Sequence, residues 1–293
     1  MSVEPSPATP PTCCVCDVPM RRKIAEWSYR CPECGLWGST LPIGINSEAH
    51  AGLDEDLRET GLADLRRHNN AVVVDRLVSQ GLAPGASLLD VGSAHGWFLA
   101  AAEERGLRAQ GVEPDEAVAA RAASSAVRVG FFPDVLDADE RFSAITYNDV
   151  LEHFPDAGAA VAASADHLEP GGLLSVNIPN SKGLFYRLAV VCHALGLRSA
   201  YERLWQLGLP SPHLWYFDRD TLVRLGRRHG FDVVSVDALD SVRRAGLWQR
   251  AHSDRKVSPV SALGVVAVWL AAPLFNASRT SDIIHVVFRR RAD

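Results

Sequence analysis

Several features are scarce in this sequence of 293 residues. The first eleven residues have no apolar run, so we expect a disordered tail over residues 1–12 and no secretory signal. The apolar stretch at residues 262–275 is shorter than the ~20 residues that cross a bilayer. We therefore expect a cytoplasmic protein. Acidic side chains outnumber basic ones, and the formal net charge is −5. This charge argues against a nucleic-acid partner.

Lysine occurs only at positions 23, 182 and 256, while arginine and alanine are abundant. We attribute this bias to codon usage, so clusters of arginine carry less functional weight than usual. Hydrophobic residues make up 47% of the chain, enough to bury one substantial core and to leave room for a small appendage.

Cysteine is nearly confined to the first 34 residues, with Cys192 as the exception. Four cysteines form two Cys-x-x-Cys pairs separated by 14 residues: Cys13, Cys16, Cys31 and Cys34. This spacing predicts a tetrahedral zinc site in a ribbon over residues 13–46, ordered by the metal it binds. A disulfide or redox pair is the competing interpretation. Cys14 is a surplus neighbour or an alternative ligand to Cys13, and Cys192 is a small buried hydrophobe.

A zinc ribbon can bind nucleic acid, bind protein or shape a substrate entrance. We expect a scaffold, because aromatic residues of the ribbon can pack on a neighbouring domain. Residues 47–81 then form a linker and a helix, with apolar positions at helical spacing over residues 62–82. The main domain follows over residues 82–293.

A cofactor cradle is predicted where a short apolar strand, residues 88–91, leads into a turn and then a helix near Trp97. Gly92 and Gly96 let the backbone turn sharply and let a ligand approach the start of the helix. Glu113, about 20 residues past the turn, ends the next strand, where such folds hold the two ribose hydroxyls of adenosine. The alternative is a strand, turn and helix with incidental glycines.

The sequence of the turn separates two cofactors. A dinucleotide fold requires Gly-x-Gly-x-x-Gly, whereas this turn places Asp90 two residues before Gly92 and puts Ala94 between the glycines. A carboxylate suits a cofactor with a cationic amino-acid end and disfavours a pyrophosphate. The turn resembles the Asp-x-Gly-x-Gly-x-Gly motif of class I S-adenosylmethionine-dependent methyltransferases. Ala94 departs from that motif and puts in doubt any backbone angle that only glycine adopts.

A second segment carries the resemblance further. Residues 148–156 read Asn-Asp-Val-Leu-Glu-His-Phe-Pro-Asp, similar to the Val-Leu-Glu-His segment of ubiquinone-biosynthesis O-methyltransferases and sugar methyltransferases. The resemblance implies a seven-stranded, mostly parallel doubly wound α/β sheet, with S-adenosylmethionine as methyl donor. It implies cofactor contacts at the turn, the next strand end and later segments: Asp90, Gly92, Ser93, Ala94, Gly96, Glu113, Pro114, Phe132, Asn148, Asp149 and Val150. Phe132 could instead fill the core.

His153 is the candidate catalytic base, because it alone in its segment has an ordinary pKa near neutrality and can take a proton from a hydroxyl. Alternatively, Glu152 and His153 orient the next helix. The resemblance also makes this Glu-His pair a candidate metal site.

An aromatic segment before the helix expected at residues 220–229 supplies four candidates for the wall of an acceptor pocket: Trp205, His213, Trp215 and Tyr216. Some of these rings could do no more than fill the core. We expect a small-molecule acceptor, namely a hydroxyl of a sugar, glycolipid or secondary metabolite. An RNA methyltransferase that holds RNA on its ribbon, a dinucleotide-dependent oxidoreductase and a catalytically silent binding protein are the rivals.

Residues 241–276 contain a cluster of basic residues followed by an apolar run. This pattern suits either a helix packed over the sheet or one lying on the inner face of a membrane beside a lipid-linked substrate.

Overall fold

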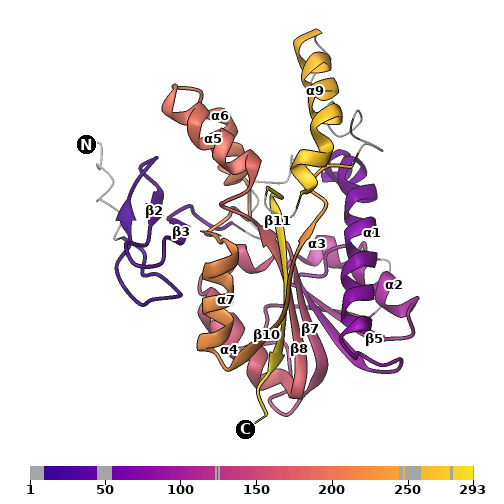
Figure 1. Ribbon diagram of the computed structural model, residues 1–293. Coiled ribbons are helices and arrows are strands. Elements are labelled where there is room, and N and C mark those ends of the chain that lie inside the picture. The colour runs from indigo at the N-terminus through magenta and orange to yellow at the C-terminus, as the bar shows by residue number, and fades with distance from the viewer. Residues whose placement is uncertain are drawn as a thin grey trace.

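The computed structural model describes residues 10–44, 55–122, 124, 126–243, 247, 259–277 and 280–292. Figure 1 shows a central twisted sheet with helices on both faces and a small second sheet at one side. Residues 1–9 of the tail predicted over residues 1–12, and residues 47–54 of the predicted linker, lie outside the described residues. Thr12, at the end of the predicted tail, instead pairs with Pro19 in an isolated β-bridge.

The central sheet has seven strands in the order β10-β11-β8-β7-β4-β5-β6. Their bounds are Phe231–Leu239, Ile283–Arg290, Leu168–Pro179, Phe142–Asn148, Ser87–Val91, Arg108–Glu113 and Val127–Val129. Pairing is parallel from β8 to β6, and β11 is antiparallel to both β8 and β10. The predicted seven-stranded, mostly parallel sheet is therefore confirmed, and β11 is its antiparallel strand.

Helices cover both faces of this sheet because apolar side chains of its central strands point to both sides. Leu88 and Leu89 of β4 point to opposite faces, and both are fully buried. Helices α1 and α2 lie on one face, and α4 and α7 lie on the other (Figure 1). The helices are α1 Glu55–Ser79, α2 Trp97–Glu103, α3 Glu116–Ala119, α4 Ala157–His167, α5 Leu184–Ala194, α6 Ser199–Leu204, α7 Arg219–Arg228 and α9 Pro259–Asn276. A short 3-10 helix, η2, covers Leu151–His153.

The second sheet joins the N-terminal ribbon, residues 10–44, to a distant part of the chain. Ribbon strands β1 (Arg21–Arg22), β2 (Ser28–Arg30) and β3 (Trp37–Ser39) are extended by β9 (Trp215–Tyr216). The predicted ribbon is thus present, and its sheet is completed by the aromatic segment of the main domain.

Two helical segments of the main domain are short. After β5, the four-residue helix α3 follows the N-cap Asp115, whose side chain accepts hydrogen bonds from the backbone N–H groups of Ala117 and Val118. After β8, the helical segment is divided into α5 and α6. Gly196, with φ of 87°, ends α5 while the N–H of Leu197 bonds back to Cys192.

Helices α5, α6 and α9 project beyond the carboxyl ends of the parallel strands (Figure 1). No helix among the described residues combines the length and apolarity that a bilayer crossing needs. Most of the basic cluster expected before α9, at residues 244–246 and 248–258, lies outside the described residues.

Candidate functional site

The turn between β4 and α2 has the predicted sharp backbone. Gly92, Ala94 and Gly96 have φ values of 71°, 44° and 74°, all in the left-handed region. Glycine adopts such angles freely, whereas alanine at Ala94 is strained there. The departure from the expected motif therefore falls at a position where the backbone favours glycine.

Glu113 faces this turn from the end of β5. Its Oε2 accepts the N–H of Ala94 at 2.9 Å, and its Oε1 accepts the N–H of Asp115 at 3.0 Å. The side chain is buried, at 8% exposure. Each carboxylate oxygen has a second lone pair, so the same group can hold the turn and accept ribose hydroxyls. Pro114, next in the chain, is half-buried.

Asp90 lies under the turn, where two side chains of the neighbouring strand β7 bind it. Its Oδ1 accepts a hydrogen bond from Thr146 Oγ1 and another from Asn148 Nδ2, both at 2.7 Å. Asn177 Nδ2 in turn donates to Asn148 Oδ1 at 2.6 Å. Burial raises the pKa of Asp90 to about 7. Asp90 therefore organises the sheet edge, and Thr146 and Asn177 are partners that the sequence analysis missed.

Close packing fixes the loops on both sides of the turn. A Cβ added to Gly92 would lie 2.7 Å from the methyl groups of Val150, and one added to Gly111 would lie 2.6 Å from Ser93 Cβ. Asp149, before Val150, has φ of 55°. Gly111 is a requirement that the sequence analysis missed, because its reason is contact with the turn rather than its own local structure. Ser93 Oγ is buried, and it has no hydrogen-bond partner among the described residues.

Phe132 lies apart from this edge. Its ring packs edge-on against Tyr147, with centroids 6.1 Å apart, and against His167 at 6.0 Å. The side chain is 6% exposed and belongs to the main apolar core. Phe131, the neighbouring ring, is the exposed one.

A compact cluster of one carboxyl group and two imidazoles follows β7. Glu152 Oε1 lies 4.0 Å from His153 Nε2 and 3.9 Å from His213 Nε2. The two imidazole centroids are 4.7 Å apart. These three side chains bring one potential metal ligand each to within 4.8 Å of one another. The structure therefore joins the Glu-His pair to His213, which is 60 positions away in the sequence.

Hydrogen bonds set the protonation of both imidazoles. His153 Nδ1 donates to the carbonyl of Pro212 at 2.9 Å, which leaves the lone pair on Nε2. Burial lowers the pKa of His153 to about 4, so the ring is neutral at pH 7. Gln206 Nε2 donates to His213 Nε2 at 2.9 Å, and burial lowers the pKa of His213 as well.

Glu152 is 1% exposed, and neither of its carboxyl oxygens has a hydrogen-bond partner among the described residues. Burial raises its pKa well above the ordinary value. Burial raises the pKa of Asp149, and the positive charge of Arg66 in α1 opposes that rise. Burial lowers the pKa of His153, and the charge of Arg66 adds to that lowering. The sequence analysis missed Arg66, since nothing in a helical pattern shows which edge of the sheet it meets.

The four candidates for the acceptor wall separate into two groups. Trp205 and Tyr216 pack with centroids 5.3 Å apart, and His213 lies 5.5 Å from Tyr216. Trp215 points to the other side of β9, where its Nε1 donates to the carbonyl of Phe154 at 2.8 Å. All four side chains are at least nine-tenths buried.

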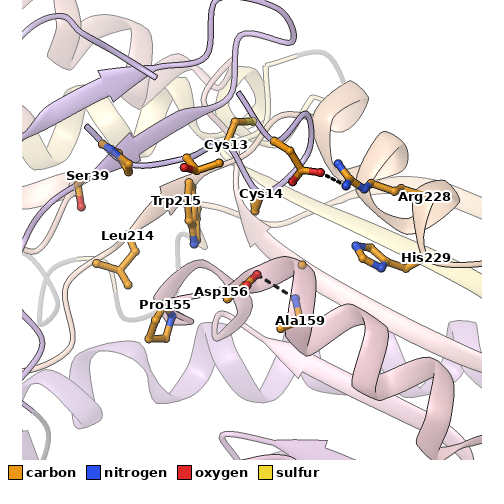
Figure 2. Close-up of a pocket in the computed structure, with 14 residues that line it drawn as sticks. Cys13, Cys14, Ser39, Pro155, Asp156, Ala159, Leu214, Trp215, Arg228 and His229 are labelled. Atoms are coloured by element: carbon orange, nitrogen blue, oxygen red, sulfur yellow. Dashed lines mark hydrogen bonds and ion pairs between the residues drawn. The ribbon is translucent and has the colours of Figure 1, made fainter. Parts of the chain in front are cut away.

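Trp215 lines a cavity of about 480 Å³ between the ribbon and helices α4 and α7. Figure 2 shows Cys14, Asp156 and His229 around the same cavity, with Arg228 paired to a ribbon carboxylate. That carboxylate belongs to Asp17. The surplus Cys14 thus lines the cavity.

The metal cluster of the ribbon consists of Cys13, Cys16, Cys31 and Cys34. Their sulfur atoms all lie within 4.8 Å of one another, and Cys13 Sγ is 3.6 Å from Cys34 Sγ. Zinc–sulfur bonds of about 2.3 Å in a tetrahedron require sulfur atoms roughly 3.8 Å apart. No disulfide links the six cysteines. The donor set and its spacing therefore fit a structural zinc ion.

The turn also fits S-adenosylmethionine. It places a buried carboxylate, Glu113, beside a left-handed backbone bend at the carboxyl end of β4, and Asn148, Asp149 and Val150 lie at the same edge. These are the positions at which open α/β sheets form their ligand crevice.

Comparison with known proteins agrees with this geometry. The methyltransferase domain family matches residues 63–236. An S-adenosylmethionine-dependent methyltransferase from Thermotoga maritima superimposes with a TM-score of 0.53 at 16% identity, covering 81% of this chain and 95% of that one. A cyclopropane synthase from Mycobacterium tuberculosis gives a TM-score of 0.52 at 18% identity, covering 74% and 82%. These two structures support the fold.

Curated relatives are ubiquinone biosynthesis O-methyltransferases. The protein from Xanthomonas campestris is 33% identical over 131 residues, which is 42% of this chain and 55% of the relative. The protein from Alkalilimnicola ehrlichii is 31% identical over 153 residues, or 48% and 62%. The chain thus spans about half the length of the curated relatives it matches. From the fold, the turn at Gly92–Gly96 and the match over residues 63–236, we conclude that the chain belongs to the methyltransferase domain family, as its resemblance to class I S-adenosylmethionine-dependent enzymes implied.

Proposed function

We propose that the protein transfers a methyl group from S-adenosylmethionine to a hydroxyl group of a small-molecule acceptor. The observation that carries this proposal is that the Glu113-bound turn and the Glu152–His153–His213 cluster follow adjacent parallel strands, β4 and β7, at one sheet edge. Similarity to O-methyltransferases supports oxygen as the methylated atom.

The cofactor would supply a methyl group already activated on a sulfonium. The turn and Glu113 bind and orient it, with Glu113 accepting the ribose hydroxyls and the turn providing close backbone approach. Alignment of this kind can contribute about 7–11 kcal/mol to lowering the barrier. The Cβ of Ala94 leaves less room for the cofactor to approach the backbone than glycine would, but the bend is still formed.

His153 would act as the base. Its Nε2 carries the lone pair, because Nδ1 is committed to the Pro212 carbonyl, and its low pKa keeps that lone pair free at neutral pH. The side chain is 18% exposed, so an acceptor can reach it. Glu152 Oε1 lies 4.0 Å from His153 Nε2, and it has no hydrogen-bond partner among the described residues, so it is placed to accept a hydrogen bond once Nε2 takes a proton.

Calorimetry and radiolabelled transfer together test the function. We expect S-adenosylhomocysteine to bind and NAD to give no heat, and we expect label from methyl-labelled S-adenosylmethionine to appear in hydroxylated aromatic or sugar acceptors. Binding of NAD alone would overturn the proposal in favour of an oxidoreductase. Salt-sensitive retardation of RNA in a gel, with label recovered in the RNA, would favour the RNA methyltransferase instead.

We also propose a finer assignment of the acceptor, as a lipid-linked molecule met at the inner membrane surface. Exposed apolar side chains gather on the two projecting helical segments: Leu195 is 75% and Leu197 63% exposed beside α5 and α6, and Leu270 is 64% exposed on α9. Exposed Arg187, Arg198 and Arg203 accompany the first segment, although the chain as a whole is acidic. Apolar tips with basic flanks suit an anionic bilayer surface.

Sedimentation with vesicles tests this assignment. The protein should sediment with phosphatidylglycerol vesicles and stay in solution with phosphatidylcholine vesicles. A Leu195→Glu, Leu197→Glu double variant should lose the interaction. The matched control, Val129→Glu, changes a half-exposed apolar residue on β6 and should sediment like the parent. Equal sedimentation of the double variant and the parent would remove the assignment.

A further inference from the structure

The ribbon meets the acceptor wall through a strand pair. Trp37 of β3 is opposite Tyr216 of β9, and Gly38 is opposite Trp215. The two strands fit closely, because a Cβ added to Gly38 would lie 3.0 Å from the Met20 side chain and 3.2 Å from the Trp215 ring. The ribbon therefore packs tightly against β9.

Beyond this pair, Ser39 makes two buried hydrogen bonds to the residues that precede β9. Its backbone N–H donates to the carbonyl of Leu214 at 2.8 Å, and its Oγ donates to the carbonyl of His213 at 2.8 Å. Ser39 is 7% exposed, so water does not replace these bonds readily. A single ribbon residue thus holds two consecutive carbonyl groups of the wall.

Leu214 carries this restraint into the candidate site. Its N–H donates to the carbonyl of Glu152 at 2.8 Å, while its own carbonyl accepts the N–H of Ser39. The backbone of His213 is also held from the other side, because its N–H donates to the carbonyl of Trp205 at 3.1 Å. Hydrogen bonds therefore run from Ser39 through Leu214 to Glu152.

Aromatic packing keeps the ribbon in this position. Trp27 stacks on Tyr201 of α6 with centroids 5.6 Å apart, and Trp37 lies 6.1 Å from Tyr186 of α5. These rings belong to one apolar cluster that also contains Trp205 and Tyr216. The wall of the candidate site and the ribbon thus share one core.

We propose that Ser39 is a positioning residue for methyl transfer, which fixes the His213 main chain so that the His213 imidazole meets His153 and Glu152. The proposal rests on the proposed function, and it makes the ribbon part of the acceptor site. A serine in this place supplies both a backbone donor and a hydroxyl donor, which alanine cannot do.

The test uses the zinc-loaded, full-length protein with labelled histidine rings, observed by NMR at one fixed pH. In Ser39→Ala we expect the ring signals of His153 and His213 to shift and the Leu214 amide to exchange about tenfold faster, as loss of one buried hydrogen bond implies. Ser39→Thr keeps the hydroxyl and should restore the parent spectrum. Neither the ring signals nor the amide exchange rate depends on turnover. If the protein proves not to be a methyltransferase, these two measurements can therefore still support or contradict the role of Ser39.

Two further variants complete the experiment. Ser164→Ala removes another buried serine hydroxyl, one that donates to the Ala160 carbonyl within α4, and should leave both imidazole signals unchanged. Gly38→Ala forces β3 away from Trp215 while leaving the Ser39 hydroxyl in place, and should shift the same two signals. Unshifted His153 and His213 signals in Ser39→Ala and in Gly38→Ala, with one zinc still bound, would overturn the proposal.

Discussion

The two halves of the sheet edge are assembled in different ways. On the cofactor side, the turn, Glu113 and Asp115 lie within 24 residues, and their hydrogen bonds are mostly local. On the acceptor side, Ser39 reaches His213 across 174 residues. A methyl donor common to many enzymes can be held by a local motif, whereas the acceptor wall that we propose for this chain is built from distant segments. The two sides should therefore fail independently.

Loss of the ribbon metal should produce the largest effect, and only on the acceptor side. Because structural zinc supplies folding free energy, Cys31→Ser combined with Cys34→Ser should abolish binding of about one zinc per chain and unfold the ribbon. Zinc content by atomic emission and thermal unfolding measure this change. Calorimetry should show that S-adenosylhomocysteine still binds. A metal-free preparation with the full thermal stability of the parent would refute the zinc site.

Removing the candidate base should affect methyl transfer to the acceptor without affecting cofactor binding. His153→Ala is expected to lower kcat by about 10²–10⁴-fold, the usual contribution of a general base, while the Kd for S-adenosylhomocysteine stays unchanged. Transfer of labelled methyl to the identified acceptor measures kcat, and calorimetry measures Kd. Unaltered kcat would assign His153 to a structural role.

The cofactor side has its own pH dependence, which arises from Asp90. Its folded pKa of about 7 exceeds the model-peptide value of 3.8, so folding favours the protonated carboxyl. Asp90 therefore contributes stability that is present below pH 4 and is lost as the pH rises to 7. The unfolding free energy of Asp90→Asn relative to the parent should rise by roughly 2–4 kcal/mol between pH 4 and pH 7. Urea unfolding at both pH values measures this difference, and a constant difference would contradict it.

The smallest effect is expected at Ala94. Since its φ of 44° suits glycine better, Ala94→Gly should raise the unfolding free energy by up to about 1 kcal/mol. Ala101, in the regular part of α2, is the matched control, because glycine there should lower the unfolding free energy by about 0.5–1 kcal/mol. Thermal unfolding of both variants decides whether the turn is strained, and a destabilised Ala94→Gly would show that it is not.

The same contrast explains which parts could be predicted from the sequence. The turn, Glu113 and the cysteine cluster follow from spacing, because local patterns set them. The seven-stranded, mostly parallel sheet followed only from the resemblance to a known family. Ser39 and the carbonyl of Pro212 could not be found, because their roles arise only when the segment before β9 meets the ribbon and η2. Gln206 was missed as well, although it bonds His213 within that same segment. Asp90 shows an intermediate case: its place was evident, but its bonds to Thr146 and Asn148 depend on which strands become neighbours.

The pairing of β3 with β9 also has a consequence for biosynthesis. The ribosome makes Ser39 first and reaches His213 only 174 residues later, an interval of roughly 10–35 s at ordinary elongation rates. During that interval the nascent ribbon has its cysteines but not the edge strand that completes its sheet. Metal capture can thus precede closure of the acceptor wall, and a chain starved of zinc during translation would reach β9 with no partner strand ready to receive it.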